Sequence, residues 1–399
     1  MTYDVAIIGA GLVGLATAHR LQTLRPDWKV CLLEKEQSIA LHQSSHNSGV
    51  IHSGIYYQPG SLRAKNCLSG YALLLEFCSQ HQVPFEICGK LIVATEADEI
   101  PALEKIYLRG KENGLYGLSM LDREAALEIE PNIACERAIQ VPQAGIIDFR
   151  NVALTLSELV EEAGGVMLLG EEVKQIQSRA TEVIIGTSGN ELRSRYAVSC
   201  AGLYADKVAR LTVPDLPCRI LPFRGEYYDL IPERRDLVNH LIYPVPNPNF
   251  PFLGVHFTRR LHGGVEAGPN AVLAFRREGY KFADFDMVEL TTTLAYRGFR
   301  KIASKYWRTG LQEMRRSLSK KKFVEALQKL VPAIVEEDVV PGRSGVRAMA
   351  CDIEGNLLDD FLILEEQRII HMVNAPSPAA TACLAIGREL ATKILKKEL

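Results

Sequence analysis

The stretch that decides the fold is VAIIGAGLVG, residues 5–14, which leads into an alanine- and leucine-rich helical pattern ending near Leu24. Its apolar start is typical of a buried parallel strand. Each glycine then serves a physical purpose, since Gly9 permits a tight turn, Gly11 lets a pyrophosphate approach the backbone, and Gly14 allows close packing of the helix on the strand. The positive end of the helix favours phosphate groups, so the stretch predicts a dinucleotide-binding unit.

A second apolar run, residues 30–33, is followed by Glu34 and Lys35, and we expect both of these residues to contact the cofactor. A carboxylate at the end of this strand accepts hydrogen bonds from the adenosine ribose and repels a 2′-phosphate, which disfavours NADP. Strand, glycine loop, helix, second strand and terminal acid therefore follow one another in the order of a Rossmann-like unit.

The sequence carries one such unit, because the glycines of residues 263–268 have the wrong spacing for a second. With a single dinucleotide site, the bound cofactor must itself be the redox group, which indicates FAD. Residues 42–54, HQSSHNSGVIHSG, are small, polar and glycine-spaced, as suits a segment that runs along the ribityl chain and the isoalloxazine. The alternative is a surface loop, although Val50 and Ile51 indicate a buried path.

The composition is that of an ordinary globular protein, with 399 residues, 47% hydrophobic residues and a formal net charge of −2. This balance argues against a nucleic-acid-binding protein. No stretch approaches the ~18 consecutive apolar residues of a membrane-spanning helix, and the N-terminus does not resemble a signal peptide. Nine scattered cysteines without a C-x-x-C pair favour reduced thiols, a cytoplasmic location and the absence of a metal site.

The pieces of the predicted nucleotide-binding fold are dispersed along the chain. Residues 219–275 are instead proline-punctuated, aromatic and rich in β-formers, which predicts an antiparallel sheet. We therefore expect an α/β fold, in which a Rossmann-like FAD-binding domain carries an inserted α+β substrate domain built on an antiparallel sheet. The expected FAD-binding domain comprises residues 1–80, 145–218 and 335–399, and the expected substrate-binding domain comprises residues 81–144 and 219–334.

Several motifs resemble those of one family. Ala201-Gly202 with Asp206 resembles the second flavin-binding motif of the D-amino-acid-oxidase-like (DAO) superfamily, and SPAAT at residues 377–381 resembles its C-terminal flavin turn. More narrowly, HNSGVIHSGIYY at residues 46–57 resembles the L-2-hydroxyglutarate oxidases and dehydrogenases. The same narrower resemblance is carried by CGKL at 88–91, GVHFT at 254–258, GPNA at 268–271 and RSGVR at 343–347.

The resemblance implies an FAD domain whose flavin is covered by the sheet of a substrate domain. It implies oxidation of L-2-hydroxyglutarate to 2-oxoglutarate by hydride transfer from C2 to flavin N5, with electrons passed to oxygen or a quinone. Some DAO relatives attach flavin through a C-terminal cysteine, but the sequence around Cys351 does not match, so we expect non-covalent FAD. Beyond the N-terminal unit, the expected cofactor-binding residues are Ser45, His46, Asn47, Gly49, Val173, Ala201, Gly202, Gly345, Ser377, Pro378, Ala379 and Thr381.

Oxidation of a 2-hydroxy acid needs a base for the hydroxyl proton, and histidine suits this role because its pKa lies near neutral pH. Of nine histidines, His52 and His256 are the best candidates. His52 lies in the loop expected beside the flavin, and His256 alternates with Val255 and Phe257 on an expected strand. The alternative for each is a hydrogen-bonded structural histidine.

A dianionic substrate also needs cations, and arginine offers a planar fork for carboxylates. Arg347 stands where related family members hold a substrate acid group, and Arg224 begins an expected strand. Lys90 is a weaker third candidate. Tyr56 and its neighbour Tyr57 are expected to donate a phenol hydrogen bond or to close the cavity. The alternative for each arginine is a surface charge, more so for Arg224.

Residues 297–322 carry ten lysines and arginines against one acid, Glu313, with Phe299, Tyr306 and Trp307 interleaved. One hypothesis is a peripheral contact with anionic lipid on the inner face of a membrane, as for a quinone-linked enzyme. The alternatives are a solvated helix face or a field that attracts an anionic substrate. Two other functions stay open: a DAO-type amino-acid or amine oxidase, and a flavin-binding protein without hydroxy-acid turnover.

Overall fold

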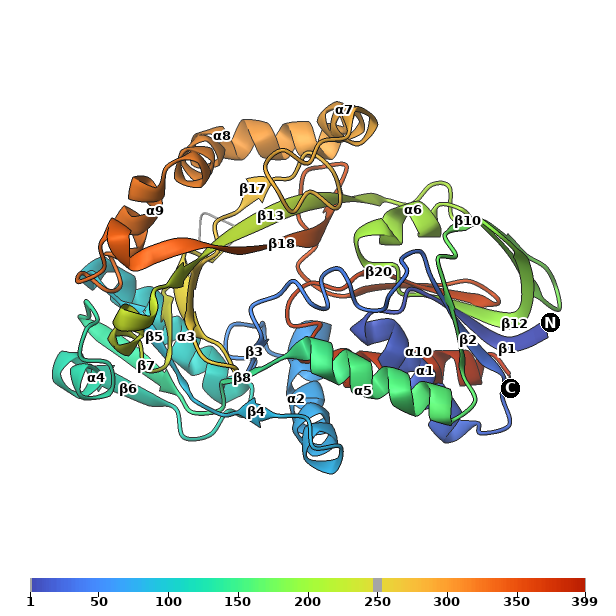
Figure 1. Cartoon of the computed structure of the whole chain (residues 1–399), viewed down its shortest axis with the longest axis horizontal. Helices are drawn as coiled ribbons and strands as arrows, with labels where there is room; N and C mark the ends of the chain where they lie inside the picture. Colours follow the sequence, from blue (N-terminus) through green and yellow to red (C-terminus); the bar gives the residue numbers. More distant parts are fainter. Residues whose placement is uncertain (1, 247–252, 399) are drawn as a thin grey trace.

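The computed structural model describes residues 2–246 and 253–398, which form two large β-sheets and one small one, flanked by helices (Figure 1). The two large sheets lie side by side. The two longest strands, β13 (Cys218–Leu230) and β18 (Val339–Asp352), belong to the second large sheet and run above the space between the two sheets. The mixed α/β fold that the sequence predicts is confirmed.

The first large sheet contains the predicted nucleotide-binding unit. Its eight strands are β1 (Thr2–Ile8), β2 (Val30–Glu34), β9 (Val166–Leu169), β10 (Val173–Ser178), β11 (Val183–Thr187), β12 (Glu191–Ser199), β19 (Leu362–Glu365) and β20 (Ile369–Asn374). β1 pairs in parallel with β2 and β12, β2 with β9, and β12 with β20. β2 and the C-terminal halves of β1 and β12 are mostly apolar and buried, because both faces of a parallel sheet are covered.

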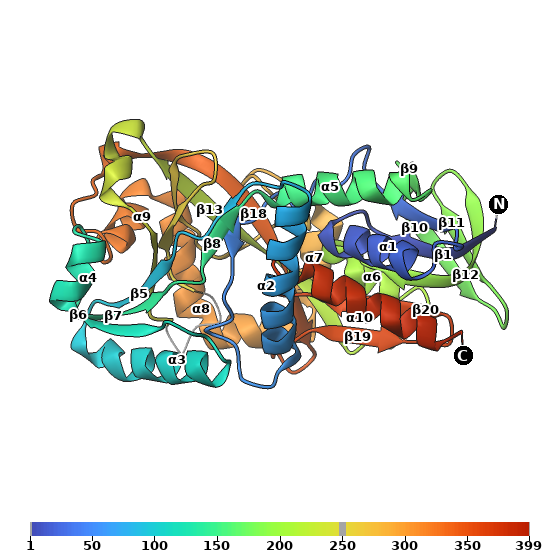
Figure 2. The same cartoon turned by 90° about the horizontal axis from the view of Figure 1, so that it is seen from below.

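Three helices cover one face of this sheet (Figure 2). α1 (Leu12–Leu24) packs between α5 (Phe149–Glu162) and α10 (Cys383–Lys396), and α2 (Leu62–Gln80) packs against α10. The approach of α1 and α10 is close at Gly387, where an added Cβ would lie 2.6 Å from the α1 backbone. Buried residues of the sheet and these helices form the largest hydrophobic core of the molecule.

The second large sheet joins strands from two distant parts of the chain. Besides β13 and β18 it contains β5 (Lys90–Ala94), β6 (Ser119–Asp122), β7 (Arg137–Val141), β14 (Leu241–Pro244), β15 (His256–Arg259), β16 (Val265–Gly268) and β17 (Val272–Leu273). β5 pairs with β14, which brings the two segments of the expected substrate part into one sheet.

Helices surround this second sheet on its outer sides (Figure 1). α7 (Met287–Ala295), α8 (Arg297–Leu318) and α9 (Lys320–Leu327) lie above the long strands. α3 (Ile100–Glu112) and α4 (Arg123–Ile129) lie near β5, β6 and β7.

One strand lies in a different sheet from the one that we expected. β18 falls within residues 335–399, which the sequence assigns to the FAD-binding part, yet it pairs with β13 from Cys218↔Asp352 to Leu230↔Val339. The sequence of β18 predicts a strand, but a strand pattern does not identify the partner of that strand. The change of sheet therefore falls after Asp352 rather than at residue 335.

A small third sheet fixes the loop that follows β2. Its strands are β3 (Val50–Ile51), β4 (Phe85–Glu86) and β8 (Gly145–Ile147), and β3 and β4 both pair with β8. Both residues of β3 are buried. The segment is thus anchored inside the molecule at residues 50–51, as its buried path predicts, whereas residues 42–49 are half-buried.

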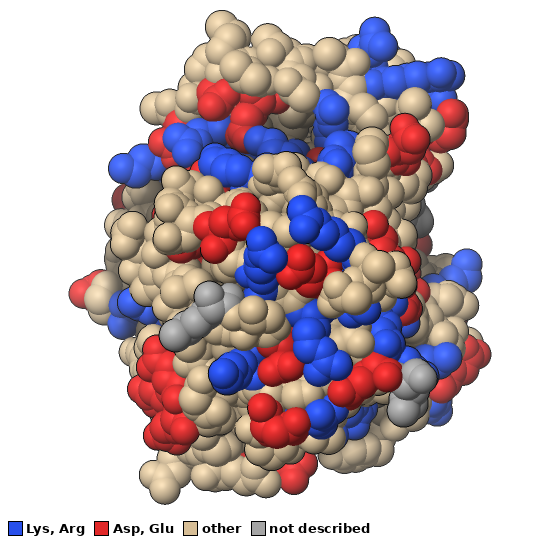
Figure 3. Space-filling model, turned by 90° about the vertical axis from the view of Figure 1, so that its right-hand side faces the viewer, with Lys and Arg blue, Asp and Glu red and all other residues tan. Residues whose placement is uncertain are grey.

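The surface carries charges of both signs. On the face shown in Figure 3, Lys and Arg side chains are interspersed with Asp and Glu side chains. No helix within residues 2–246 or 253–398 is long and apolar enough to cross a membrane.

Candidate active site

A large cavity with a volume of about 1350 Å³ extends from the end of β1 to the underside of β13 and β18. Its walls come from both large sheets: Gly9 and Glu34 on one side, and Tyr227 and Arg347 on the other. The cavity is larger than the roughly 300–1,000 Å³ of ordinary small-molecule sites. It therefore has room for a dinucleotide and a small substrate together.

The glycine loop forms one end of the cavity and behaves as its spacing predicts. Gly9 has a φ of +103°, and an added Cβ there would lie 2.5 Å from the carbonyl oxygen of Cys200. At Gly14 a Cβ would lie 2.0 Å from the Gly9 carbonyl oxygen, so this glycine packs α1 onto β1 and does not line the cavity. Gly11 lines the cavity, where a Cβ would meet only the Ser44 hydroxyl, 3.0 Å away.

Glu34 and Lys35, at the end of β2, also line the cavity. The Glu34 carboxylate accepts the backbone N–H of Ala10 at 2.9 Å, which fixes it beside the glycine loop. The Lys35 ammonium contacts the carboxylates of Glu36 and Glu278. The Glu34 carboxylate thus lies beside the glycine loop, and Lys35 joins the first sheet to the segment that precedes α7.

The Glu36 and Glu278 carboxylates and the His42 imidazole offer ligand atoms within 4.8 Å of one another, which is compatible with a metal ion. However, the Lys35 ammonium already lies against both carboxylates. The Lys35 ammonium thus already supplies the positive charge that a metal ion would bring, and we interpret the cluster as an ion-pair network.

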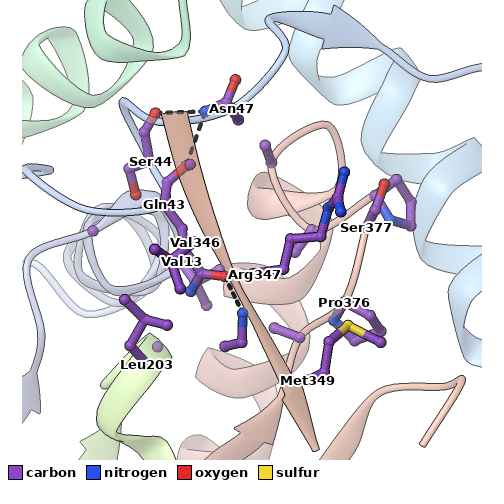
Figure 4. Close-up of a pocket in the computed structure, with 18 of the residues that line it drawn as sticks. Val13, Gln43, Ser44, Asn47, Leu203, Val346, Arg347, Met349, Pro376 and Ser377 are labelled. Atoms are coloured by element: carbon purple, nitrogen blue, oxygen red, sulfur yellow. Dashed lines mark hydrogen bonds between the residues drawn. The ribbon is translucent and has the colours of Figure 1, made fainter. Parts of the chain in front are cut away.

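The middle of the cavity is built from the loop after β2 and from β18, which face each other in Figure 4. The Asn47 side-chain amide donates to the carbonyl oxygens of Gln43 and Ser44, and the Gln43 side chain accepts the N–H of Ala348. An added Cβ at Gly345 would lie 2.4 Å from the His46 carbonyl oxygen. The predicted residues that line this region are His46, Asn47, Val173, Ala201, Gly202 and Gly345.

Besides Gly14, three residues predicted to bind the cofactor do not line the cavity: Ser45, Gly49 and Thr381. The Ser45 hydroxyl donates to the Ala40 carbonyl at 2.6 Å. Gly49 has a φ of +68°, so it serves the turn of the loop. The Thr381 hydroxyl accepts the backbone N–H of His52 at 3.1 Å. All three support the walls from behind, because neighbouring residues of a turn point in different directions.

The C-terminal turn closes another side of the cavity with Ser377, Pro378 and Ala379, as predicted. The Ser377 hydroxyl lies 3.4 Å from Nε2 of His52. The turn thus brings the C-terminal part of the first sheet into contact with the loop that carries the first candidate base.

Both candidate bases, His52 and His256, line the cavity. Burial lowers the pKa of each imidazole to about 3, so both are neutral at pH 7. Nδ1 of His256 lies 2.9 Å from the carbonyl oxygen of Gly254. A carbonyl only accepts hydrogen bonds, so Nδ1 carries the hydrogen and Nε2 keeps a lone pair that can take a proton.

The two candidate arginines have different surroundings. Arg347 lines the cavity, and in Figure 4 its side chain extends on the side where Ser377 lies. Its Nη1 is 3.4 Å from the Asn270 carbonyl oxygen. Arg224 is 1% exposed, pairs with Glu226 at 2.9 Å and does not line the cavity. On β13 alternate residues face opposite sides, and Gly225 and Tyr227 face the cavity. The assignment of Arg224 to the site is therefore corrected.

The tyrosines predicted at the site, Tyr56 and Tyr57, both line the cavity, whereas Lys90 lies behind its wall. The hydroxyl of Tyr56 is buried without a hydrogen-bond partner among the described residues. Burial raises the pKa of Tyr56 well above its usual value, so its phenol is a donor at neutral pH. The Lys90 ammonium lies 4.7 Å from the centre of the Tyr56 ring.

Sequence reasoning missed other residues of this wall. Tyr243 lines the cavity, and its ring centre is 4.0 Å from that of His256. Arg63 also lines it and donates to the Ser377 carbonyl at 2.8 Å. Ser44 takes the place predicted for Ser45. A strand tyrosine and a helix arginine carry no local signal for a site, because only the fold brings them there.

Cys351 lies away from the cavity. It packs with Leu221, Phe223 and Ile302 in a hydrophobic cluster, and it is not among the residues that line the cavity. Non-covalent attachment of the cofactor stays a prediction.

The chain is similar to known proteins over its whole length. The model of the family described as FAD dependent oxidoreductase (DAO) matches residues 4–393. The chain is 51% identical to the L-2-hydroxyglutarate dehydrogenase of Indibacter alkaliphilus, and the match covers 100% of both chains. It is 44% identical to the human mitochondrial L-2-hydroxyglutarate dehydrogenase, over 99% of this chain and 89% of the human protein.

Solved structures share the fold. The L-α-glycerophosphate oxidase of Mycoplasma pneumoniae with FAD bound has a TM-score of 0.82 at 23% identity, over 99% of this chain and 95% of that chain. The glycine oxidase of Geobacillus kaustophilus has a TM-score of 0.74 at 18% identity, over 100% and 96% of the two chains. The glycine cradle at Gly9, Gly11 and Gly345 and the size of the cavity fit FAD. The chain therefore belongs to the DAO family of FAD-dependent oxidoreductases.

Proposed function

We propose that this protein oxidises L-2-hydroxyglutarate to 2-oxoglutarate. The observation that carries the proposal is the union, in one cavity, of the FAD-binding glycine loop with two neutral histidines and Arg347. These groups supply a proton acceptor and a carboxylate-binding cation. The relatives at 51% and 44% identity are named L-2-hydroxyglutarate dehydrogenases, which identifies a substrate with the matching chemistry.

FAD, when bound, would supply the acceptor for the hydride that leaves C2 of the substrate. The residues that we propose to hold it are the glycine loop and Glu34 at the adenosine end, Asn47 and Gly345 in the middle, and the turn at Ser377 near the flavin. The remaining chemistry falls to side chains at the far end of the cavity. They must bind two carboxylates and remove one proton.

We assign the base to His256. Its Nδ1 is held by the Gly254 carbonyl, so its Nε2 can receive the hydroxyl proton as the C2–H bond breaks. His52 is held by Thr381 and lies beside Ser377. We assign it to orienting the hydroxyl rather than to deprotonating it.

We assign one substrate carboxylate to Arg347, whose guanidinium offers two parallel N–H donors. Tyr56 is proposed to donate its unpartnered phenol hydrogen to the same ligand. Tyr57 and Tyr243 then form the aromatic wall that excludes water from the reacting carbon.

Product analysis with a dye as electron acceptor tests this function. L-2-hydroxyglutarate should yield one 2-oxoglutarate for each two-electron reduction of the dye, with no ammonia. Release of ammonia from an amino acid at a higher kcat/KM would assign the protein to the amino-acid oxidases instead.

We further propose that electrons leave to a quinone and that α8 contacts an anionic membrane surface. Trp307 and Leu318 are 55% and 66% exposed, and Leu311 is also exposed. Arg308 and Arg315 lie exposed on the same helix. Apolar side chains with flanking cations are typical of helices that lie in a membrane interface.

Co-sedimentation tests this contact. The holoenzyme should bind vesicles that contain anionic lipid, bind less at high salt, and lose binding when the three exposed apolar residues of α8 are replaced by serine. Equal recovery with neutral and anionic vesicles would contradict the contact and leave oxygen as the simpler acceptor.

A further inference from the structure

Lys90 carries a buried amino group, which can be charged or neutral near pH 7, without an acidic partner in the described part of the chain. The residue is 2% exposed, at the start of β5, and no carboxylate is among the groups that perturb it. A buried charge is costly unless another charge or a set of hydrogen bonds compensates it. A lysine retained here is best explained by an anion that comes from outside the chain.

Lys90 also lines a smaller pocket beside His240, but the contacts of its ammonium group point to the large cavity. Its Nζ lies 4.7 Å from the ring centres of both Tyr56 and Tyr243, and these two tyrosines line the cavity. The Tyr243 ring in turn packs against His256. Tyr56 and Tyr243 thus form a tyrosine wall, and the ammonium lies against it at the end of the cavity that carries the two histidines.

We propose that Lys90 is a positioning residue, whose ammonium supplies the buried counter-charge for the anionic substrate beside His52 and His256. It acts through the tyrosine wall, because it does not itself line the cavity. The inference rests on the proposed function, since it takes the substrate to be a dicarboxylate. Arg347 then binds one end of the substrate directly, and Lys90 stabilises charge at the reacting end.

This role couples substrate binding to protonation. Burial lowers the pKa of Lys90 to about 7, so near pH 8 most of the free protein carries a neutral amine there. A bound dianion favours the charged form and raises this pKa, so binding near pH 8 takes up a proton.

The other titratable groups near Lys90 do not change charge at this pH. The pKa values of both histidines are lowered to about 3 by burial, so they stay neutral. Burial raises the pKa of the Cys67 thiol to about 12, and it also raises the pKa values of the two flanking tyrosines. Among these groups, Lys90 is therefore the one whose charge changes near pH 8, and its variants show whether the proton belongs to it.

Calorimetric titration of the oxidised holoenzyme with 2-oxoglutarate at about pH 8, in two buffers of different ionisation enthalpy, measures this proton. The wild type should take up a large fraction of one proton. Lys90→Met should take up none and bind about tenfold more weakly, as expected for loss of one unit charge near the ligand. Lys90→Arg should keep the affinity without proton uptake, because arginine is always charged.

The matched control is Lys65→Met, which removes an exposed lysine of α2 and should leave both quantities unchanged. Wild-type affinity and proton uptake in Lys90→Met would overturn the proposal. If Lys90→Met fails to retain FAD, the Lys90→Arg variant gives the test. The proposal would be overturned if the affinity of Lys90→Arg for 2-oxoglutarate declined with rising pH as steeply as that of the wild type. A wild type that neither binds 2-oxoglutarate nor is reduced by L-2-hydroxyglutarate would instead reject the proposed function.

Discussion

Two arginines on neighbouring strands show how the position of one residue on a strand decides its role. Arg347 on β18 pairs in register with Phe223 on β13, one residue before Arg224. Arg347 reaches the cavity, whereas Arg224 lies in an ion pair with Glu226. Both residues are arginines, but we expect the loss of Arg347 to affect catalysis and the loss of Arg224 to affect stability.

Arg347→Met should lower kcat/KM for L-2-hydroxyglutarate, with a rise in the corresponding activation free energy of about 2–5 kcal/mol, because a desolvated carboxylate loses its partner. Arg224→Met is the control: it leaves Glu226 without its cation and should lower the free energy of unfolding by about 3–5 kcal/mol. Steady-state kinetics and thermal unfolding of both variants separate these effects. Equal kcat/KM in Arg347→Met and the wild type would remove this arginine from the site.

The pH dependence of kcat/KM follows from the buried histidines. The base must be unprotonated, and burial holds the pKa values of His52 and His256 near 3, below the ordinary value of 6.5. The acid limb of kcat/KM should therefore lie well below pH 6, with no loss between pH 7 and pH 6. An acid limb centred near 6.5 would contradict a buried neutral base. His256→Asn should lower kcat by about 10²–10⁴-fold, while His52→Asn should lower it less.

At the scale of elements, the close contact between β18 and the loop after β2 shapes the middle of the cofactor cavity. Gly345→Ala would place a Cβ 2.4 Å from the His46 carbonyl oxygen, and backbone cannot move as a side chain does. We expect this variant to bind FAD more weakly and to unfold at a lower temperature. Gly310→Ala on α8 is the control: no atom lies within 4 Å of its added Cβ. It should be neutral or stabilising. Equal FAD content in both variants would contradict the claim that the close contact at Gly345 shapes the cofactor cavity.

The elements of this fold were largely predictable from local sequence. The first helix ends at Leu24 as predicted, and the apolar run at residues 30–33 forms β2, because their patterns match the periods of helix and strand. The partner of β18 and the burial of Lys90 were not predictable. Both depend on contacts between distant segments, which periodicity does not encode.

The candidate site was predictable only where a motif carries its own geometry. The glycine loop and the turn at Ser377 were placed in this way. Tyr243 and Arg63 were missed because each lies on an ordinary strand or helix and reaches the cavity through the fold. Arg224 was assigned wrongly because its strand was predicted without the face toward which each residue points.

At the scale of the whole molecule, we propose a discontinuous FAD-binding part with an inserted substrate part. The first and second large sheets are the centres of these two parts, and β18 belongs with the second. The cavity lies where the two large sheets meet, so neither sheet alone supplies all the residues that line it.

The cofactor should be released when the protein is denatured with acid, because Cys351 is buried away from the cavity. Precipitation followed by absorbance of the supernatant measures this directly. Yellow colour that stays with the pellet would show a covalent bond and contradict the expected attachment.

The most direct test of the central claim adds each enantiomer of 2-hydroxyglutarate to the oxidised holoenzyme without oxygen. Reduction of the bound flavin is then measured by its absorbance. We expect L-2-hydroxyglutarate to bleach the flavin fully and rapidly, with one equivalent of 2-oxoglutarate formed, while D-2-hydroxyglutarate leaves the spectrum unchanged. Bleaching by both enantiomers at similar rates, or by neither, would contradict the proposed oxidation of L-2-hydroxyglutarate at this site.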